Sequence, residues 1–327
     1  MRDLIAAETL YQAKIASEQM EGALSRRIRP VKRALVKLIA ELEAGIDFAE
    51  DDIDLLPASD IVARIARIRE PLQALERSFA YGRVVRDGLS LAIVGRPNAG
   101  KSSLFNRLVE RERAIVTATP GTTRDLVTER VSLGGIPLDL IDTAGLRVAE
   151  DEAESIGIQK SREALADADV VLVVLDATAE ALSPDETALL EQMRNRRGIA
   201  VVNKGDLPHG GIGGEARRLL GDVLQPVETS ALTGEGIAVL QKKILELMRG
   251  EDREMESGLM TNLRQQQAVT ESLQSLADGD AAVAGNVPHE MLLLDLYGAL
   301  RQLDALTGDT TADDILNLIF STFCIGK

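Results

Sequence analysis

The sequence contains few of the side chains that build disulfide frameworks or metal clusters. Cys324 is the single cysteine, and His209 and His289 are the two histidines among 327 residues. One thiol excludes a disulfide within the chain and a cysteine-based zinc site, and two imidazoles exclude a multi-histidine metal centre. This usage is typical of a reducing compartment, so we expect a cytoplasmic protein.

Aromatic residues and long apolar runs are also scarce. Aromatics make up 2% of the chain and tryptophan is absent, so stacking platforms for single-stranded nucleic acid are not expected. The sequence has no run of eighteen apolar residues, and its start lacks a basic segment followed by an apolar stretch. Neither a transmembrane helix, nor any membrane role, nor a secretory signal is therefore predicted.

Positive charge is in deficit. Lys and Arg number 37 against 52 Asp and Glu, which gives a formal net charge of −15. A protein that grips a nucleic-acid backbone unaided is normally basic. Any nucleic-acid role of this chain therefore needs cations from a partner or from another segment.

Three stretches differ in hydrophobic pattern. Residues 1–88 and 251–327 carry apolar stripes at alternating steps of three and four, typical of a helical bundle. The stripes are Leu24, Ile28, Val31, Leu35, Leu38 and Leu42, then Ile61, Ile65, Ile68, Leu72, Leu75 and Phe79, then Leu292, Leu296, Leu300, Leu303 and Leu306. Residues 89–250 instead alternate short β-rich runs with helical segments, which predicts a mostly parallel sheet covered on both faces.

This order predicts an α/β domain at 89–250 inserted into one discontinuous helical domain, 1–88 and 251–327. Gly134-Gly135, between two strand-like runs, predicts a hairpin and hence one antiparallel edge strand. Pro30 and Pro71 interrupt the first two stripes, and each predicts a kink or a break.

The segment GRPNAGKS, residues 95–102, matches G-x-x-x-x-G-K-[ST] between an apolar strand and a helical run. Its glycines let backbone N–H groups face phosphate oxygens at a helix start. Lys101 is expected to reach the β and γ phosphates, and Ser102 to offer its hydroxyl to Mg²⁺. A glycine-rich turn that binds nothing is the alternative, and the flanking strand and helix disfavour it.

Two later motifs fit the same site. Asp142-Thr-Ala-Gly145 follows a second apolar strand, with Asp142 placed for the magnesium shell and Gly145 for the γ-phosphate. Asn203-Lys-Gly-Asp206 ends another apolar strand. The Asp206 carboxylate only accepts hydrogen bonds, which suits the two adjacent donors of guanine. Adenine offers no donors at those positions, and a buried carboxylate left unpaired is costly, so this residue is expected to reject ATP. Ser230-Ala-Leu232 follows the last strand and would complete the base pocket.

Two segments concern hydrolysis. Residues 114–125, AIVTATPGTTRD, are typical of a switch loop that offers Thr122 or Thr123 to Mg²⁺. Leu146 stands where Ras-type GTPases have a glutamine that orients water, so another polar group is required. The acidic residues that follow are Glu150, Asp151, Glu152 and Glu154. We expect most of them to be solvated and at least one to reach the water.

These motifs resemble the MnmE (TrmE) family of tRNA-modification GTPases. The resemblance is carried by GRPNAGKSS, AIVTATPGTTRD, DTAGLR, the acidic stretch through Glu154-Ser-Ile-Gly, NKGD and the terminal FCIGK, and it covers essentially the whole chain. It implies an α/β Ras-like P-loop GTPase domain inserted into a discontinuous all-α helical-bundle domain. Family members begin with a folate-binding domain, which we expect this chain to lack.

The resemblance implies roles for individual positions. Asn98, Thr117, Thr119 and Thr122 match the potassium site, Ser102 and Thr123 match the magnesium ligands, and Glu154 matches the residue that orients the catalytic water through another water. Lys101, Thr123 and Glu154 would thus be catalytic. The implied GTP-binding set is Asn98, Ala99, Gly100, Lys101, Ser102, Ser103, Thr117, Ala118, Thr119, Pro120, Gly121, Thr122, Thr123, Asp142, Thr143, Ala144, Gly145, Asn203, Lys204, Asp206, Ser230, Ala231 and Leu232.

The terminal FCIGK carries two further implied roles. By its chemistry alone, Cys324 is a small apolar residue packed in the helical domain. The resemblance instead implies a thiol that acts in tRNA modification, and it places Lys327 near a tetrahydrofolate derivative. The family's partners are GTP or GDP, tRNA, the flavoprotein MnmG, and a second copy whose G domain pairs in a potassium-dependent way.

Two other function classes remain to be weighed. A ribosome-assembly GTPase of the Era or Der type shares the P-loop core but carries an RNA-binding domain after it or a second G domain. A helical scaffold with a vestigial nucleotide site should have lost Lys101, Asp142 or Asp206 first, and all three are present. The insertion between helical stretches and the FCIGK tail disfavour the first alternative.

Overall fold

The computed structural model describes residues 1–47, 56–111, 127–142, 168–194, 196–221, 224–249, 258–308, 310–311 and 314–316. The chain divides into two compact units. The helical unit comprises Met1, Lys14–Arg83 and Asp252–Lys327, and the sheet unit comprises Arg2–Ala13 and Val84–Glu251. The helical unit is therefore discontinuous, with the sheet unit inserted into its sequence.

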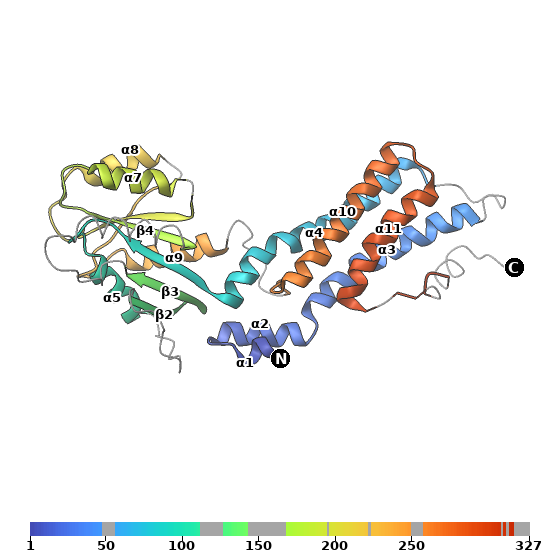
Figure 1. Cartoon of the computed structure of the whole chain (residues 1–327), viewed down its shortest axis with the longest axis horizontal. Helices are drawn as coiled ribbons and strands as arrows, with labels where there is room; N and C mark the ends of the chain where they lie inside the picture. The colour runs from blue at the N-terminus through green and yellow to red at the C-terminus, as the bar shows by residue number, and fades with distance from the viewer. Residues whose placement is uncertain are drawn as a thin grey trace. The chain divides into compact units, whose positions relative to one another are not determined.

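Four long helices supply most of the helical unit. They are α3 (Ala23–Asp47), α4 (Ala58–Asp87, up to Arg83 in this unit), α10 (Leu263–Ala284) and α11 (His289–Thr307), preceded by part of α2 (Leu10–Met20) (Figure 1). Helix α11 packs against α10 and α3. The predicted stripes form one core, in which Ile28, Leu35 and Leu72 are completely buried. Burial of these stripes is the main source of the bundle's stability.

Helices α3 and α4 continue through Pro30 and Pro71, so the predicted interruption does not break either helix. A proline removes one main-chain hydrogen bond from a helix and crowds the preceding turn. Both prolines are exposed, whereas Val31 and Leu72 beside them are buried in the core. Packing of the apolar face therefore holds each helix together despite the lost hydrogen bond.

The described residues of the sheet unit form a sheet of six strands in the order β2-β3-β1-β4-β5-β6. In chain order they are β1 (Leu89–Val94), β2 (Val127–Leu133), β3 (Ile136–Asp142), β4 (Val170–Asp176), β5 (Gly198–Asn203) and β6 (Val227–Glu228). Strand β2 is antiparallel to β3 and all other pairs are parallel. The predicted hairpin is confirmed, because Gly134 and Gly135 have φ angles of 59° and 85°, which suit a tight two-residue turn.

Helices α5 (Lys101–Arg111), α7 (Pro184–Met193), α8 (Ile212–Leu220) and α9 (Ile237–Arg249) belong to the same unit (Figure 1). Strands β4 and β5 are apolar along their length and buried, as expected for the centre of a covered sheet. The loops after β1, β4 and β5 leave the same edge, because parallel strands share the direction of their carboxyl ends. This edge brings the predicted motifs at 95–102 and 203–206 together, because the side chain of Asn203 donates to the carbonyl of Ala99. Among the described helices, none is long and apolar enough to cross a membrane.

Residues 2–13, which we predicted to belong to the helical domain, group with the sheet unit instead. They comprise α1 (Arg2–Ile5) and the first residues of α2. Thr9 Oγ1 donates to the carbonyl of Gly135 at 2.6 Å, and Gln12 Nε2 donates to the carbonyls of Val85 and Arg86 at 3.0 and 2.8 Å. Glu8 forms an ion pair with Arg130 on β2 at 2.8 Å. These polar contacts join residues that are far apart in the sequence, so no local sequence pattern predicts them.

Helix α4 approaches the segment before α10 so closely that Gly82 has no room for a side chain. A Cβ at this position would collide with the main-chain carbonyl of Met260. Since Met260 is completely buried, that carbonyl cannot move without opening the core. We therefore expect Gly82→Ala to lower the free energy of unfolding by about 2–3 kcal/mol.

The matched control is Gly214→Ala in α8, where a Cβ meets nothing within 4 Å. This change should raise stability by about 0.5–1 kcal/mol, because alanine is the better helix former. Thermal and denaturant unfolding followed by circular dichroism measures both variants. Equal stability of the two variants would contradict the proposed collision at Gly82.

Candidate nucleotide site

The loop between β1 and α5 contains the predicted phosphate-binding residues. Gly95 has a φ of 146°, and a Cβ there would collide with the carbonyl of Val174 on β4. Lys101 is buried, and its Nζ donates to the carbonyl of Arg96 at 2.7 Å, which holds the ammonium at the loop. Ser102 and Ser103 are exposed in the first turn of α5, where N–H groups and the helix dipole favour an anion.

Asn203, the last residue of β5, joins this loop to the loop after β6. Its Nδ2 donates to the carbonyl of Ala99 at 3.1 Å, and its Oδ1 accepts from the N–H of Ala231 at 3.0 Å. Asn203 is 1% exposed, so both hydrogen bonds are shielded from water and hold the two loops together. Gly100 completes the fit, because a Cβ there would collide with Nδ2 of Asn203.

Asp206 is exposed. Its Oδ1 accepts a hydrogen bond from Ser230 Oγ at 2.6 Å, and Ser230 Oγ in turn accepts from the N–H of Thr233 at 3.0 Å. These contacts fix the orientation of the carboxylate. Among the described residues, none donates to its second oxygen, so the carboxylate keeps acceptor positions for donors on a ligand.

Lys204 has a φ of 68° and forms an ion pair with Asp176 at the end of β4, with Nζ and Oδ2 2.5 Å apart. Partial burial alone would raise the pKa of Asp176. Hydrogen bonds from Lys204 and Thr178 outweigh that effect and lower the pKa below its usual value. Asp176 thus stays ionised and anchors the lysine stem beside Asp206. Sequence reasoning missed Asp176, although an Asp that ends an apolar parallel strand is a recognisable signal.

Arg107 on α5 is a second residue that sequence reasoning missed. Its Nε donates to the carbonyl of Ala231 at 2.9 Å, and a terminal nitrogen donates to the carbonyl of Leu232 at 2.5 Å. The helix that begins at Lys101 therefore also fixes the loop that carries Ser230. The side chain of Leu232 is 77% exposed and points to no core. No sequence signal distinguishes Arg107 from the other arginines of the chain.

Several predicted site residues lie outside the described residues. They are Thr117, Ala118, Thr119, Pro120, Gly121, Thr122, Thr123, Thr143, Ala144, Gly145, Glu154, Cys324 and Lys327. Asp142 is described as the last residue of β3, next to Ile93 of β1 in register. Asn98 is exposed with a φ of 65°.

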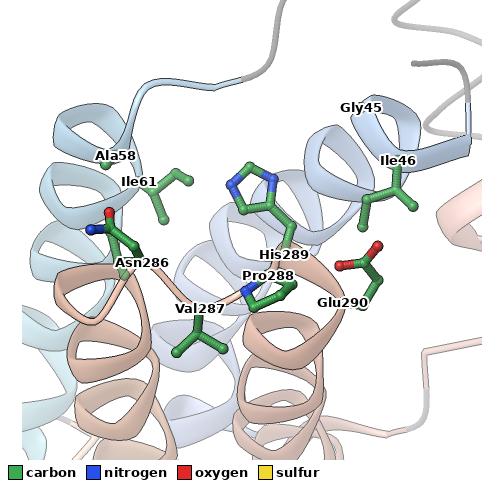
Figure 2. A pocket seen from close by; sticks show the side chains of 10 residues that line it. Gly45, Ile46, Ala58, Ile61, Asn286, Val287, Pro288, His289 and Glu290 are labelled. Carbon is green, nitrogen blue, oxygen red and sulfur yellow. The ribbon is translucent and has the colours of Figure 1, made fainter. Parts of the chain in front are cut away.

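The described residues contain no group of three His, Cys, Asp or Glu side chains able to hold a metal by itself. Figure 2 shows a separate cavity in the helical unit, where α3 ends, α4 begins, and α11 begins with His289 and Glu290; its volume is about 460 Å³. None of the predicted nucleotide residues lines it.

Comparison with known proteins relates the whole chain to one family. The family model described as the MnmE helical domain matches residues 1–324. The chain is 60% identical to the tRNA modification GTPase MnmE of Koribacter versatilis, over 100% of this chain and 71% of that protein. It is 37% identical to the MnmE of Carboxydothermus hydrogenoformans, over 99% of this chain and 70% of that protein.

Among solved structures, the G domain of the T. maritima FeoB iron transporter is 28% identical, with a TM-score of 0.35. It covers 49% of this chain and 98% of that one. The family match includes both helical stretches, which separates this chain from the ribosome-assembly alternative. The chain is a GTPase and belongs to the MnmE family of tRNA-modification GTPases.

Proposed function

We propose that the chain hydrolyses GTP to GDP and phosphate with stimulation by potassium. We further propose that this cycle drives a conformational change during modification of C5 of the wobble uridine of tRNA, together with the flavoprotein MnmG. The contact that carries the proposal is the side chain of Asn203, which ties Ala99 of the phosphate loop to Ala231 of the base loop. One buried amide thereby sets the distance between the loop that would bind the triphosphate and the loop that would bind the base.

Base selection follows from the orientation of Asp206. Its free carboxylate oxygen would accept from the ring N–H and the exocyclic amine of guanine, while adenine offers no donors there. Because the carboxylate is exposed in this structure, the entering base itself would remove it from water. An adenine would then leave a desolvated carboxylate unpaired, and that penalty disfavours ATP.

Phosphate binding follows from the loop at 95–101 and the start of α5. The Lys101 ammonium would move from the carbonyl of Arg96 to phosphate oxygens, over a short distance because it is already held at the loop. Ser102 and Thr123 are the proposed Mg²⁺ ligands, and Asp142 through Gly145 would face the γ-phosphate. Bound Mg²⁺ would neutralise charge that develops on the phosphates during transfer.

Hydrolysis without a glutamine after Gly145 requires other groups. We propose that Glu154 orients the attacking water through a second water. K⁺ would be held where other GTPases place an arginine, by Asn98, Thr117, Thr119 and Thr122. Of these, Asn98 has a positive φ of 65°. Pairing of two G domains across their nucleotide faces would complete this arrangement. Cys324 and Lys327, near a tetrahydrofolate derivative, would act in the modification itself.

Turnover of GTP in potassium and in sodium, at several protein concentrations, tests the proposal. We expect the rate to be higher in KCl than in NaCl at equal ionic strength, because the smaller ion fits a potassium cage poorly. The rate per chain should also rise with protein concentration, because pairing of two G domains is bimolecular. Equal rates in both salts at every concentration would overturn the ion and pairing assignments.

Asp206→Asn should change which purine is bound. The amide offers a donor where guanine also has donors, so the affinity for GDP should fall by about a hundredfold or more, while the affinity for xanthosine diphosphate rises. Competition binding with GDP and xanthosine diphosphate measures this change in base preference. Glu235→Gln, an exposed carboxyl in the same loop, is the control and should keep the preference of the parent chain.

Glu154→Ala should lower kcat by about a hundredfold and leave nucleotide affinity nearly unchanged, because the role proposed for Glu154 is in water activation and not in binding. Glu152→Ala is the matched control and should retain turnover. Single-turnover hydrolysis and GDP titration separate the two effects. Normal hydrolysis by the Glu154 variant would remove this residue from the mechanism.

A further inference from the structure

The helical unit has a groove of about 480 Å³, lined by residues of α3 and α4, that the proposed GTPase cycle does not use. Its lining residues are Pro30, Val31, Ala34, Lys37, Arg64, Arg67, Ile68 and Pro71. Val31 and Ile68 are buried and form an apolar floor, while Lys37 and Arg67 are exposed. The exposed prolines carry short side chains, so the floor is open between cationic walls.

Charge on this face is opposite to that of the whole chain. Residues 23–37 contain Arg26, Arg27, Arg29, Lys32, Arg33 and Lys37 and no Asp or Glu, although the chain carries −15. Arg29, Arg33 and Lys37 follow each other at four-residue steps and so share one face of α3, about 6 Å apart along the axis. Like charges at this spacing destabilise a helix, so folding does not account for them.

One acidic side chain, Glu41, is shared by two of the three cations that line the groove. Glu41 lies 3.9 Å from Lys37 and also accepts from Arg64. Among the described residues, Arg29, Arg33 and Arg67 have no acidic partner. By contrast, Lys32 and Arg69, on the same two helices, pair with Asp304 and Asp280. Lys32 and Arg69 are thus neutralised by acidic partners on α11 and α10, whereas Arg67 in the groove and Arg29 and Arg33 on α3 are left for an anion from outside.

We propose that this groove binds the phosphodiester backbone of RNA. Evenly spaced cations suit a polymer with regularly spaced phosphates, and arginine grips phosphate through two parallel hydrogen bonds. The apolar floor would lie against sugar or base faces, on which guanidinium groups also stack. The inference rests on the proposed tRNA role. It gives tRNA a docking surface on this chain, which the overall net charge of −15 would not suggest.

The test uses the full chain and a transcribed tRNA with a uridine at the wobble position. The groove variant combines Lys37→Glu with Arg67→Glu. The matched control combines Arg264→Glu with Arg301→Glu on α10 and α11 of the same unit. It makes the same charge change at exposed positions that have no acidic partner in the described part of the chain. Fluorescence anisotropy measures RNA affinity as the salt concentration varies, and circular dichroism checks the fold.

We expect the groove variant to lose about tenfold or more in RNA affinity at physiological salt, with a salt dependence weaker by about two units of slope. The control pair should bind nearly as the parent does. Equal losses in both pairs, or full affinity of the groove variant, would overturn the proposal. Binding of polyglutamate as tight as that of RNA would also overturn it, in favour of an acidic protein partner.

GTP turnover measured on the same samples keeps the two proposals apart. Both variants should hydrolyse GTP as the parent chain does, because the substituted positions lie in the helical unit and outside the nucleotide motifs. Absent turnover in the parent chain would contradict the proposed function and leave the RNA affinities as an independent result. Loss of RNA binding together with normal turnover supports the groove.

Discussion

The nucleotide site depends on one buried amide. Asn203 donates to the loop after β1 and accepts from the loop after β6, and it is 1% exposed. Leaving such a group unsatisfied in the interior costs about 1–3 kcal/mol, so the two loops are held in a single relative position. Gly100 and Arg107 follow from the same constraint: the glycine makes room for the amide, and the arginine fixes the base loop from the other side.

This constraint separates two kinds of site residue. Asn203, Arg107 and Asp176 form hydrogen bonds with other protein groups and so hold the loops in place. Asp206 and Ser102 are exposed and can contact a bound nucleotide. A rigid inner layer with an exposed outer layer can bind a nucleotide without reorganising its framework. Base discrimination then falls to the one carboxylate that the framework orients.

Local signals in the sequence predicted most of the sheet unit. The apolar runs at β4 and β5, the paired glycines of the hairpin and the glycine-lysine loop all follow from short-range rules, and each is found in the structure. Long-range contacts could not be predicted in this way. The association of residues 2–13 with the sheet depends on Gln12 meeting carbonyls of residues 85 and 86, and the uninterrupted helix at Pro30 depends on packing of the opposite face. The exposure of Asp206 likewise depends on how loops lie, which residue chemistry alone does not fix.

The most direct measurement of the central claim is a calorimetric titration of the parent chain with GDP and, separately, with ADP in the presence of Mg²⁺. A base chosen by the Asp206 carboxylate predicts that GDP binds at least about a hundredfold more tightly than ADP. Equal affinities for the two nucleotides would contradict the account, because they would show that the phosphates are bound without any choice of base.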